Sequence, residues 1–301
     1  MSDAMRVDYK SLAPYVRYVH EVELPGGRVI GERLIYDHEF IFVVRGSGTL
    51  RIEDRVHPMA AGQLFYIRPH LLNEMRVDEA MPMRCFAVHF DYVYLGEALD
   101  FSPYRVYLKQ PKAEPDVPEP VLRARPSLEP RDLDIPERLP VNNVHQFLEI
   151  FQELCLHFES RSSDAQLWLR SAMLRCIALI HRHLTTKEGV KIGHPHAETI
   201  LQGINYMEKH FDRKITVSML ANQAMVSPKY YGTLFKEVTG QTVAEYLLRL
   251  RMEKAKSLFM QRKYRVQEVA EMVGIEDLPY FTKLFKKHTG ISPKRFANMA
   301  L

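Results

Sequence analysis

The first third of the chain alternates short apolar runs with turn residues. FIFVV (40–44) is followed by RGSG, TLRI (49–52) by EDR and GQLFYI (62–67) by RPH, and MRCFAVHF (83–90) closes the series. Runs of this length that are rich in β-branched and aromatic residues are typical of strands, and their regular spacing is typical of a small sandwich or barrel. The pattern predicts an antiparallel β domain from about residue 29 to residue 89.

Apolar residues recur with the period of a helix between residues 142 and 184. ESRSSDAQ (159–166) interrupts the recurrence, so two helices are predicted. Such stripes are most often packed in a core, but they also form seams between two copies of a chain, and periodicity leaves both options open. The apolar positions are Val144, Phe147, Leu148, Phe151, Leu154, Cys155 and Phe158, then Leu167, Leu169, Met173, Leu174, Ile177 and Ile180.

Two segments separate these patterns from one another. Prolines are dense between Pro103 and Pro140, which excludes a continuous helix and predicts an extended, partly ordered connector. TTKEGVKIGHPH (185–196) has the composition of a linker. The predicted organisation is a β domain with its connector at 1–140, a helical pair at 141–184, the linker at 185–196 and an all-helical domain at 197–301.

The last hundred residues contain one helical unit twice. LFKEVTG (234–240) recurs fifty residues later as LFKKHTG (284–290), and Ala221 recurs forty-nine residues later as Ala270. A repeat of this density marks one supersecondary unit used twice. Each copy predicts a short helix, a tight connection and a longer helix, which is the order of a helix-turn-helix.

The connection in each copy has the residues that this motif needs. Gly274 permits a left-handed turn in the second copy; Met225 takes its place in the first, where a side chain costs about 1 kcal/mol. Ser227 is a good N-cap, and Pro228 suits the first helical position. The second helix of such a motif lies in the major groove of DNA, so each copy predicts a recognition helix.

Each predicted recognition helix has an apolar face for its core and an outward face for DNA. Lysine donates to guanine O6 and N7, and threonine contacts a base edge or the thymine methyl. Lysines late in the helix favour phosphate over base contact. The outward residues are Lys229, Gly232, Thr233 and Lys236 in the first helix, and Leu278, Pro279, Thr282, Lys283, Lys286 and Lys287 in the second.

A single amphipathic helix is predicted between the copies, at 242–260. Packing on both units, it would hold two recognition helices at a fixed separation. One chain would then reach two successive major-groove segments, about 34 Å apart. The apolar stripe of this helix is Val243, Tyr246, Leu247, Leu250, Ala255 and Leu258.

Composition adds a charge asymmetry and excludes several classes of protein. The 301 residues suit two domains, and the net charge of +4 divides unevenly, with 17 Lys/Arg against 10 Asp/Glu from residue 197 onward and 24 against 27 before it. This asymmetry is typical of a nucleic-acid-binding segment joined to a neutral domain. The three cysteines lack the spacing of a disulfide framework or zinc ribbon. No apolar run is long enough to cross a membrane, so a cytoplasmic protein without a membrane partner is expected.

The C-terminal third resembles the DNA-binding region of the AraC/XylS family of bacterial transcription regulators. The resemblance covers about residues 204–296 and is most specific in VSPKYYGTLFKEVTGQTVAEYLLRLRMEKAKSLF and VQEVAEMVGIEDLPYFTKLFKKHTGISPKRF. It implies base contacts by Lys229, Gly232, Thr233, Leu278, Pro279, Thr282 and Lys283. Phosphate contacts are expected from the helix start at Ser227 and from Lys236, Lys286 and Lys287.

Residues 38–77 are similar to the cupin-like barrel found in sugar-responsive members of that family. Glu39 fits the cupin glutamate, but ERLI (32–35) lacks the His-x-His pair, and Asn73 stands where the second motif has histidine. A three-histidine metal centre cannot be assembled from these residues, so no metal or other cofactor is expected. A small polar effector is expected instead, held at the barrel mouth by Arg33, His38, Glu39, Tyr66, His70 and Asn73.

These patterns predict an α+β multidomain protein, with an N-terminal cupin-like β-barrel and helical pair and a C-terminal all-α double helix-turn-helix. The resemblance implies an effector-responsive activator of carbohydrate-use genes, not an enzyme. Its expected partners are double-stranded DNA, RNA polymerase and a small-molecule effector such as a sugar, with the choice between monomer and homodimer open. The alternatives are a metal-dependent cupin enzyme with a helical tail, a barrel that serves only dimerisation, and a protein–protein adaptor.

Overall fold

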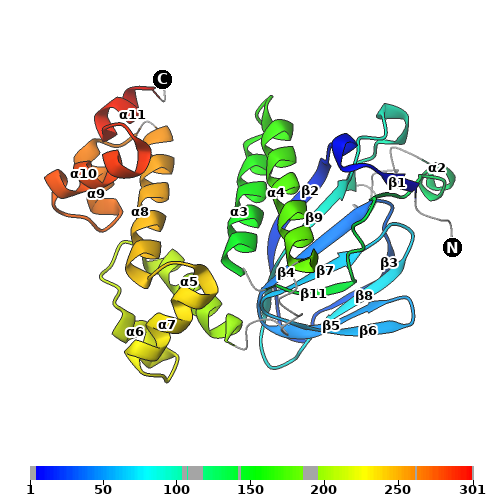
Figure 1. The fold of residues 1–301 in the computed structure, drawn as a ribbon, viewed down its shortest axis with the longest axis horizontal. Coiled ribbons are helices and arrows are strands. Elements are labelled where there is room, and N and C mark those ends of the chain that lie inside the picture. Colours follow the sequence, from blue (N-terminus) through cyan, green and yellow to red (C-terminus); the bar gives the residue numbers. More distant parts are fainter. Residues whose placement is uncertain are drawn as a thin grey trace. The chain divides into compact units, whose positions relative to one another are not determined.

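The computed structural model describes residues 5–103, 107, 118–141, 144–185, 196–261 and 263–299. The chain forms two compact units, Met1–Glu198 and Thr199–Leu301 (Figure 1). The described part of the first unit combines two large β-sheets and a two-stranded one with helices, and the second unit is all-helical, which confirms the predicted fold class.

Two antiparallel sheets face each other in the N-terminal unit. The five-stranded sheet has the order β11-β7-β4-β9-β2 and the four-stranded sheet the order β3-β8-β5-β6. The four predicted apolar runs are β4, β5, β7 and β9. The strands are β2 (Tyr15–Leu24), β3 (Val29–Leu34), β4 (His38–Arg45), β5 (Ser47–Ile52), β6 (Arg55–Ala60), β7 (Gln63–Ile67), β8 (Leu72–Val77), β9 (Met83–Asp91) and β11 (Arg138–Pro140).

Side chains of β4 alternate between two buried environments. Ile41 and Val43 belong to the apolar core shared by the two sheets. Phe42 lies on the opposite face, where its ring is 5.5 Å from that of Phe151 in α3. Helices α3 (Val144–Ser160) and α4 (Ala165–Thr185) lie against this outer face (Figure 1). Because both faces of the strand are covered, its sequence is a continuous apolar run.

The helical pair packs on the five-stranded sheet, but the predicted stripe of α4 is wrong at two positions. Leu167 and Leu174 are 67% and 38% exposed. Ala172 and Cys176 are fully buried instead. The angle at which α4 packs on β2 and α3 determines which of its side chains are buried. The buried face of α4 is therefore rotated away from Leu167 and Leu174.

The proline-rich region is more structured than the predicted connector. β10 (Leu128–Pro130) pairs in parallel with β1 (Met5–Val7), and β11 extends the five-stranded sheet beside β7. A short helix, α2 (Glu119–Arg123), has proline at its start. The described strands agree with the prediction of an extended connector, and the prediction is wrong only for the short helix α2. Proline is tolerated in edge strands and in the first helical turn.

Several remaining segments complete the N-terminal unit or lie outside the described residues. Short 3-10 helices occupy η1 (Tyr9–Ser11) and η2 (Glu97–Leu99). Residues 104–106 and 108–117 of the predicted connector and 186–195 of the predicted linker are not among the described residues.

The C-terminal unit contains two helix-turn-helix pairs, α6–α7 and α9–α10, on either side of the long helix α8. Within the described residues no helix combines the length and apolarity needed to cross a bilayer. The helices are α5 (Ala197–His210), α6 (Val217–Gln223), α7 (Pro228–Thr239), α8 (Val243–Met260), α9 (Val266–Met272), α10 (Leu278–Thr289) and α11 (Pro293–Met299) (Figure 1).

Helix α8 packs on both pairs, as its apolar stripe predicts. The predicted stripe is wrong in detail near the second pair. Met252 and Phe259 are buried there, whereas Leu250 and Leu258 are only half-buried.

The repeat extends beyond the two helices of each motif. The rings of Phe235 and Tyr246 meet at 5.6 Å and 85°, and those of Phe285 and Phe296 meet at 5.5 Å and 81°. Both partners stand fifty residues apart in the sequence. Helix α11 is therefore the counterpart of the first turns of α8, and each copy is a three-helix unit.

Candidate functional site

Both recognition helices begin at a side-chain cap. The hydroxyl of Ser227 accepts a hydrogen bond from the Tyr230 N–H at 3.3 Å, and the Asp277 carboxylate accepts one from the Tyr280 N–H at 2.8 Å. Proline follows in the first turn of each helix. Proline has no N–H, and the N–H groups of Tyr231 and Phe281 already bond the Ser227 and Asp277 carbonyls. The first turn of each helix therefore offers at most one further N–H to a phosphate, that of Lys229 in α7 and that of Leu278 in α10.

The turn before each recognition helix is left-handed, as the sequence predicts. Met225 has φ 54° and Gly274 has φ 72°. The two positions differ in their surroundings, because Met225 is 92% exposed while a side chain at Gly274 would meet the backbone of Asp212.

The inner face of each recognition helix is held in a core. Tyr231, Leu234 and Phe235 of α7 are buried, as are Phe281 and Phe285 of α10. These contacts fix which side of each helix faces outward, and the outward side carries the predicted DNA-contacting residues.

Of the seven predicted base-contacting residues, four are exposed and three are half-buried. Leu278 packs against the core of the second unit, so its outward contribution is reduced. The Thr233 hydroxyl donates to the Lys229 carbonyl at 3.1 Å. The exposed residues are Lys229, Thr233, Pro279 and Lys283, and the half-buried ones are Gly232, Leu278 and Thr282. The predicted phosphate-contacting residues, Ser227, Lys236, Lys286 and Lys287, are all exposed.

One matched pair on these helices was not predicted from the sequence. Tyr230 and Tyr280 are 47% and 54% exposed and stand at equivalent positions of the two copies. Each stands beside an aromatic core residue, Tyr231 or Phe281, so residue type alone does not show which aromatic is buried and which is exposed. The direction in which the helix points each side chain decides this. The repeat itself was the signal that could have identified them.

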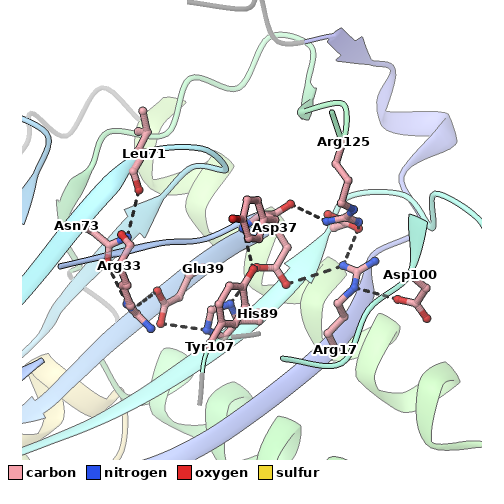
Figure 2. A network of polar contacts seen from close by, with 12 residues as sticks. Arg17, Arg33, Asp37, Glu39, Leu71, Asn73, His89, Asp100, Tyr107 and Arg125 are labelled. Atoms are coloured by element: carbon pink, nitrogen blue, oxygen red, sulfur yellow. Dashed lines mark hydrogen bonds and ion pairs between the residues drawn. The ribbon is translucent and has the colours of Figure 1, made fainter. Parts of the chain in front are cut away.

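A second candidate site is a buried polar network inside the N-terminal unit (Figure 2). Its centre is Glu39, whose side chain is 2% exposed. The Arg33 guanidinium lies 2.5 Å from one oxygen of this carboxylate, and the His89 ring lies 3.4 Å from the other. Arg33 also donates to the side-chain oxygen of Asn73 at 2.9 Å.

The network continues through Asp37 to two further arginines. Asp37 accepts from the hydroxyl of Tyr107 at 2.8 Å, and its carboxylate lies 3.0 Å from the His89 ring. Asp91 lies 2.6 Å from Arg17 and 2.7 Å from Arg125. Burying so many charges is costly unless they are mutually compensated. Titratable groups with perturbed pKa values cluster at functional sites, which makes this network a candidate site.

Two histidines of this interior have opposite pKa shifts. Burial lowers the pKa of His89, but the carboxylates of Glu39 and Asp37 outweigh it and raise that pKa to about 9. Burial dominates at His20 and lowers its pKa to about 4. At neutral pH His89 is therefore a cation between two carboxylates, and His20 is neutral.

The structure brings together three of the six residues predicted to line a barrel mouth, namely Arg33, Glu39 and Asn73. His38 and Tyr66 lie on the opposite face of the five-stranded sheet, where the Tyr66 hydroxyl is 2.7 Å from the His38 ring. The prediction of one shared mouth is wrong for this pair, because neighbouring residues of a strand point to opposite faces.

His70 is the third residue that stays apart from Glu39. Its ring nitrogen lies 3.0 Å from the carbonyl oxygen of Arg125, and its backbone has φ 65°. His70 lies in the loop between β7 and β8 and contacts the backbone of Arg125, whose side chain belongs to the network.

His89 was not predicted as a site residue, although the sequence contained a signal for it. It pairs with Glu39 across β9 and β4. Strand alternation in AVHFDY puts His89 on the same face as Ala87 and Cys85, both in the core between the sheets.

The residues of this interior do not suit a metal ion. Both oxygens of Glu39, the residue that fits the cupin glutamate, are engaged by Arg33 and His89. Across the described part of the chain, no group of three or more His, Cys, Asp or Glu side chains is arranged to hold one.

Comparison with known proteins matches both units. A helix-turn-helix domain family model matches residues 220–299, and a cupin domain model matches residues 20–89. The transcriptional activator RhaR of Cronobacter sakazakii is 23% identical over 265 residues, covering 86% of this chain and 84% of RhaR. The C-terminal domain of the Geobacillus stearothermophilus response regulator AraT is 30% identical over 35% of this chain and 88% of that one, with a TM-score of 0.34.

Relatives with higher identity match only part of their own length. AdaA of Bacillus subtilis, named a bifunctional transcriptional activator and DNA repair enzyme, is 36% identical over 106 residues, which are 35% of this chain and 50% of AdaA. The chain likewise spans 54% of the B. subtilis regulator YisR. With both family models placed on their matching units, the chain belongs to the AraC-type helix-turn-helix transcription regulators and carries an N-terminal cupin domain.

Proposed function

We propose that the chain binds duplex DNA through α7 and α10 and regulates transcription in response to a small molecule. The observation that carries this proposal is the matched construction of the two recognition helices. Each has a capped start, a buried inner face and an exposed face with polar and basic side chains. Two such helices on one chain suit successive major-groove segments, about 34 Å apart.

The roles proposed for individual residues follow their position along each helix. Lys229 and Thr233 in α7, and Thr282 and Lys283 in α10, read base edges. Gly232, Leu278 and Pro279 face the same groove but offer no polar side chain. Ser227, Lys236, Lys286 and Lys287 contact phosphates, together with the hydroxyls of Tyr230 and Tyr280 at the edge of each face.

The experiment that tests DNA binding begins with selection of bound duplexes from random or genomic fragments by the full-length chain. The affinity of the selected site is then measured by fluorescence anisotropy at several salt concentrations. We expect the association constant to fall steeply as salt rises, because the contacts displace counterions from the phosphates. Binding that is absent, or that is insensitive to salt, would contradict the proposal.

For the N-terminal unit we propose an effector-binding role, with residues 1–140 as the sensor. Arg33, Glu39 and Asn73 offer donors and acceptors that suit the hydroxyls of a sugar-like molecule. Arg33 is the most accessible of the three, with its side chain 25% exposed. Activation of carbohydrate-use genes through RNA polymerase is the regulatory outcome that we propose, and RhaR, a relative along most of the chain, is named a transcriptional activator.

The competing function is that of a metal-dependent cupin enzyme. Metal analysis of protein purified without chelator separates the two. We expect no stoichiometric iron, manganese or nickel, because the carboxylate of Glu39 is already paired with Arg33 and His89. A stoichiometric metal that is lost in the Glu39→Gln variant would favour the enzyme.

We also propose that α4 is a seam between two copies of the chain. Its exposed stripe contains Leu167, Ser171, Leu174 and Ala178, which recur at helical spacing along one side. Large apolar side chains on an exposed helix face favour burial against a partner. The helical pair at 141–184 would then join two sensor domains, and the linker at 185–196 would lead to the DNA-binding domain at 197–301.

A further inference from the structure

Helix α5 contacts the first helix-turn-helix unit, since a β-carbon built on Gly203 would meet the Tyr231 hydroxyl of α7, and the segment that follows α5 contacts the second unit. Phe211 packs against the core formed by residues such as Met252, Phe281 and Phe285. Arg251 of α8 donates from Nε to the Phe211 carbonyl at 2.8 Å and from Nη2 to the Arg213 carbonyl at 2.8 Å. Phe211 and Arg213 both follow the end of α5 at His210, so the guanidinium provides hydrogen-bond donors for backbone carbonyls that lie outside the helix.

The turn of the second motif closes on the same segment. A β-carbon built on Gly274 would lie 2.3 Å from the Asp212 carbonyl oxygen and 3.0 Å from Nη2 of Arg251. Three parts of the chain therefore meet here, namely the end of α5, the middle of α8 and the turn between α9 and α10. We call Phe211, Asp212, Arg213, Arg251 and Gly274 the joint.

Among the residues that the structure describes, the first motif has no equivalent of this contact at its own turn. Met225 occupies the position that corresponds to Gly274 and is 92% exposed. The joint therefore belongs to the connection between the two units, and it is not part of the helix-turn-helix motif that the two copies share. Without it, the units would be connected mainly through α8, and bending or twisting of one helix would change the angle between α7 and α10.

We propose that Arg251 is a positioning residue, which locks the two recognition helices in one relative orientation and so sets the spacing of the two DNA elements that the chain accepts. This inference rests on the proposed function. The joint provides a second attachment, off the axis of α8, and two attachment points remove the rotation that a single helix would allow. Binding two elements at once depends on such geometry, because affinity is lost where the spacing cannot be matched.

The orientation is tested first without DNA. Spin labels are introduced as unnatural amino acids at the equivalent positions Lys236 and Lys286 of the full-length chain, and the distance distribution is measured by double electron–electron resonance. We expect one narrow distribution in the native chain and a clearly broader one in Arg251→Gln. The matched control is Arg249→Gln, which alters an arginine of the same helix that binds Gln241 within the first unit. Equal widths in the native chain and Arg251→Gln would overturn the proposal.

The consequence is then tested on the selected DNA site and on variants with one or two base pairs inserted or deleted between its two elements. We expect the native chain and Arg249→Gln to lose at least tenfold in affinity per altered spacing, and Arg251→Gln to lose less than threefold. Retained spacing preference in Arg251→Gln would overturn the positioning role. Failure of the native chain to bind any duplex would contradict the proposed function, while the spin-label distances still decide whether the joint orders the two helices.

Discussion

The α-carbon of Gly274 lies so close to Asp212 that an added β-carbon would be 2.3 Å from the Asp212 carbonyl oxygen. Gly274 also has φ 72°, so a side chain there would be strained by its own backbone as well as by its neighbour. At the matching turn, Met225 has φ 54° and points into solvent. The turn of the first copy therefore requires only a left-handed backbone, whereas the turn of the second copy also requires that its residue has no side chain.

We expect Gly274→Ala to destabilise the C-terminal unit by at least about 2 kcal/mol, because the left-handed backbone alone costs about 1–2 kcal/mol and the contact with Asp212 adds to it. Urea unfolding of the full chain, followed by far-UV circular dichroism, measures the loss. The matched change Met225→Gly should stabilise the unit by up to about 1 kcal/mol. Equal and small effects at both positions would contradict this account.

A charge change late in α10 should act differently from one nearer its start. We expect Lys283→Ala to relax base preference at one position of the selected site, and Lys287→Ala to weaken all sites alike and to lower the salt slope by about 1. Anisotropy on a panel of single-base variants measures both. If Lys287→Ala changed the preferred base, the assignment of that residue to phosphate would be wrong.

The stability of the N-terminal unit should fall between pH 6.5 and 9. His89 has a folded pKa raised to about 9, so its contribution is complete below the unfolded value of 6.5 and is lost as pH rises through 9. The difference corresponds to about 3 kcal/mol. Urea unfolding followed by the fluorescence of Trp168, the single tryptophan of the chain, reports on this unit.

The control for this pH dependence is His89→Gln, which should be less stable at pH 6.5 and nearly independent of pH up to 9. His20, with a pKa of about 4, acts in the opposite direction and only below pH 6.5, because its neutral form is favoured by folding. A native chain whose stability is flat from pH 6.5 to 9 would show that His89 is not held as a cation.

Replacing the exposed leucines of α4 should separate two copies of the chain. We expect the native protein to sediment as a dimer and the Leu167→Glu, Leu174→Glu double variant to sediment as a monomer, since each glutamate would be buried without a partner in the seam. Both side chains are exposed within one chain, so the fold of the monomer should be unchanged. Sedimentation of the native chain as a monomer would contradict the seam.

Several features of the fold follow directly from local sequence. FIFVV and its neighbouring runs became β4, β5, β7 and β9, and the repeated LFK…TG segments became the ends of α7 and α10. Their glycines, Gly240 and Gly290, adopt φ 74° and 81°. Local patterns suffice at these positions because backbone conformation, capping and turn formation depend on residues close in the chain.

The candidate sites depended more on contacts between distant residues. The outward faces of α7 and α10 could be predicted, since helical period separates them from Phe235 and Phe285. The polar network could not, because Glu39 meets Arg33 from β3 and His89 from β9, and strand pairing is long-range. Neighbours in sequence such as His38 and Glu39 were assigned to one site, although the strand directs them to opposite faces.

The sequence alone therefore determined the two-unit organisation, the double helix-turn-helix and the residues on its outward faces, since these depend on periodicity and on a repeat. Tertiary structure decided which charges are paired in the sheet interior and where the two motifs are joined. Arg251 shows the reason: nothing in its local sequence distinguishes it from Arg249, and only the arrival of the Phe211 and Arg213 carbonyls from forty residues away makes it part of the joint.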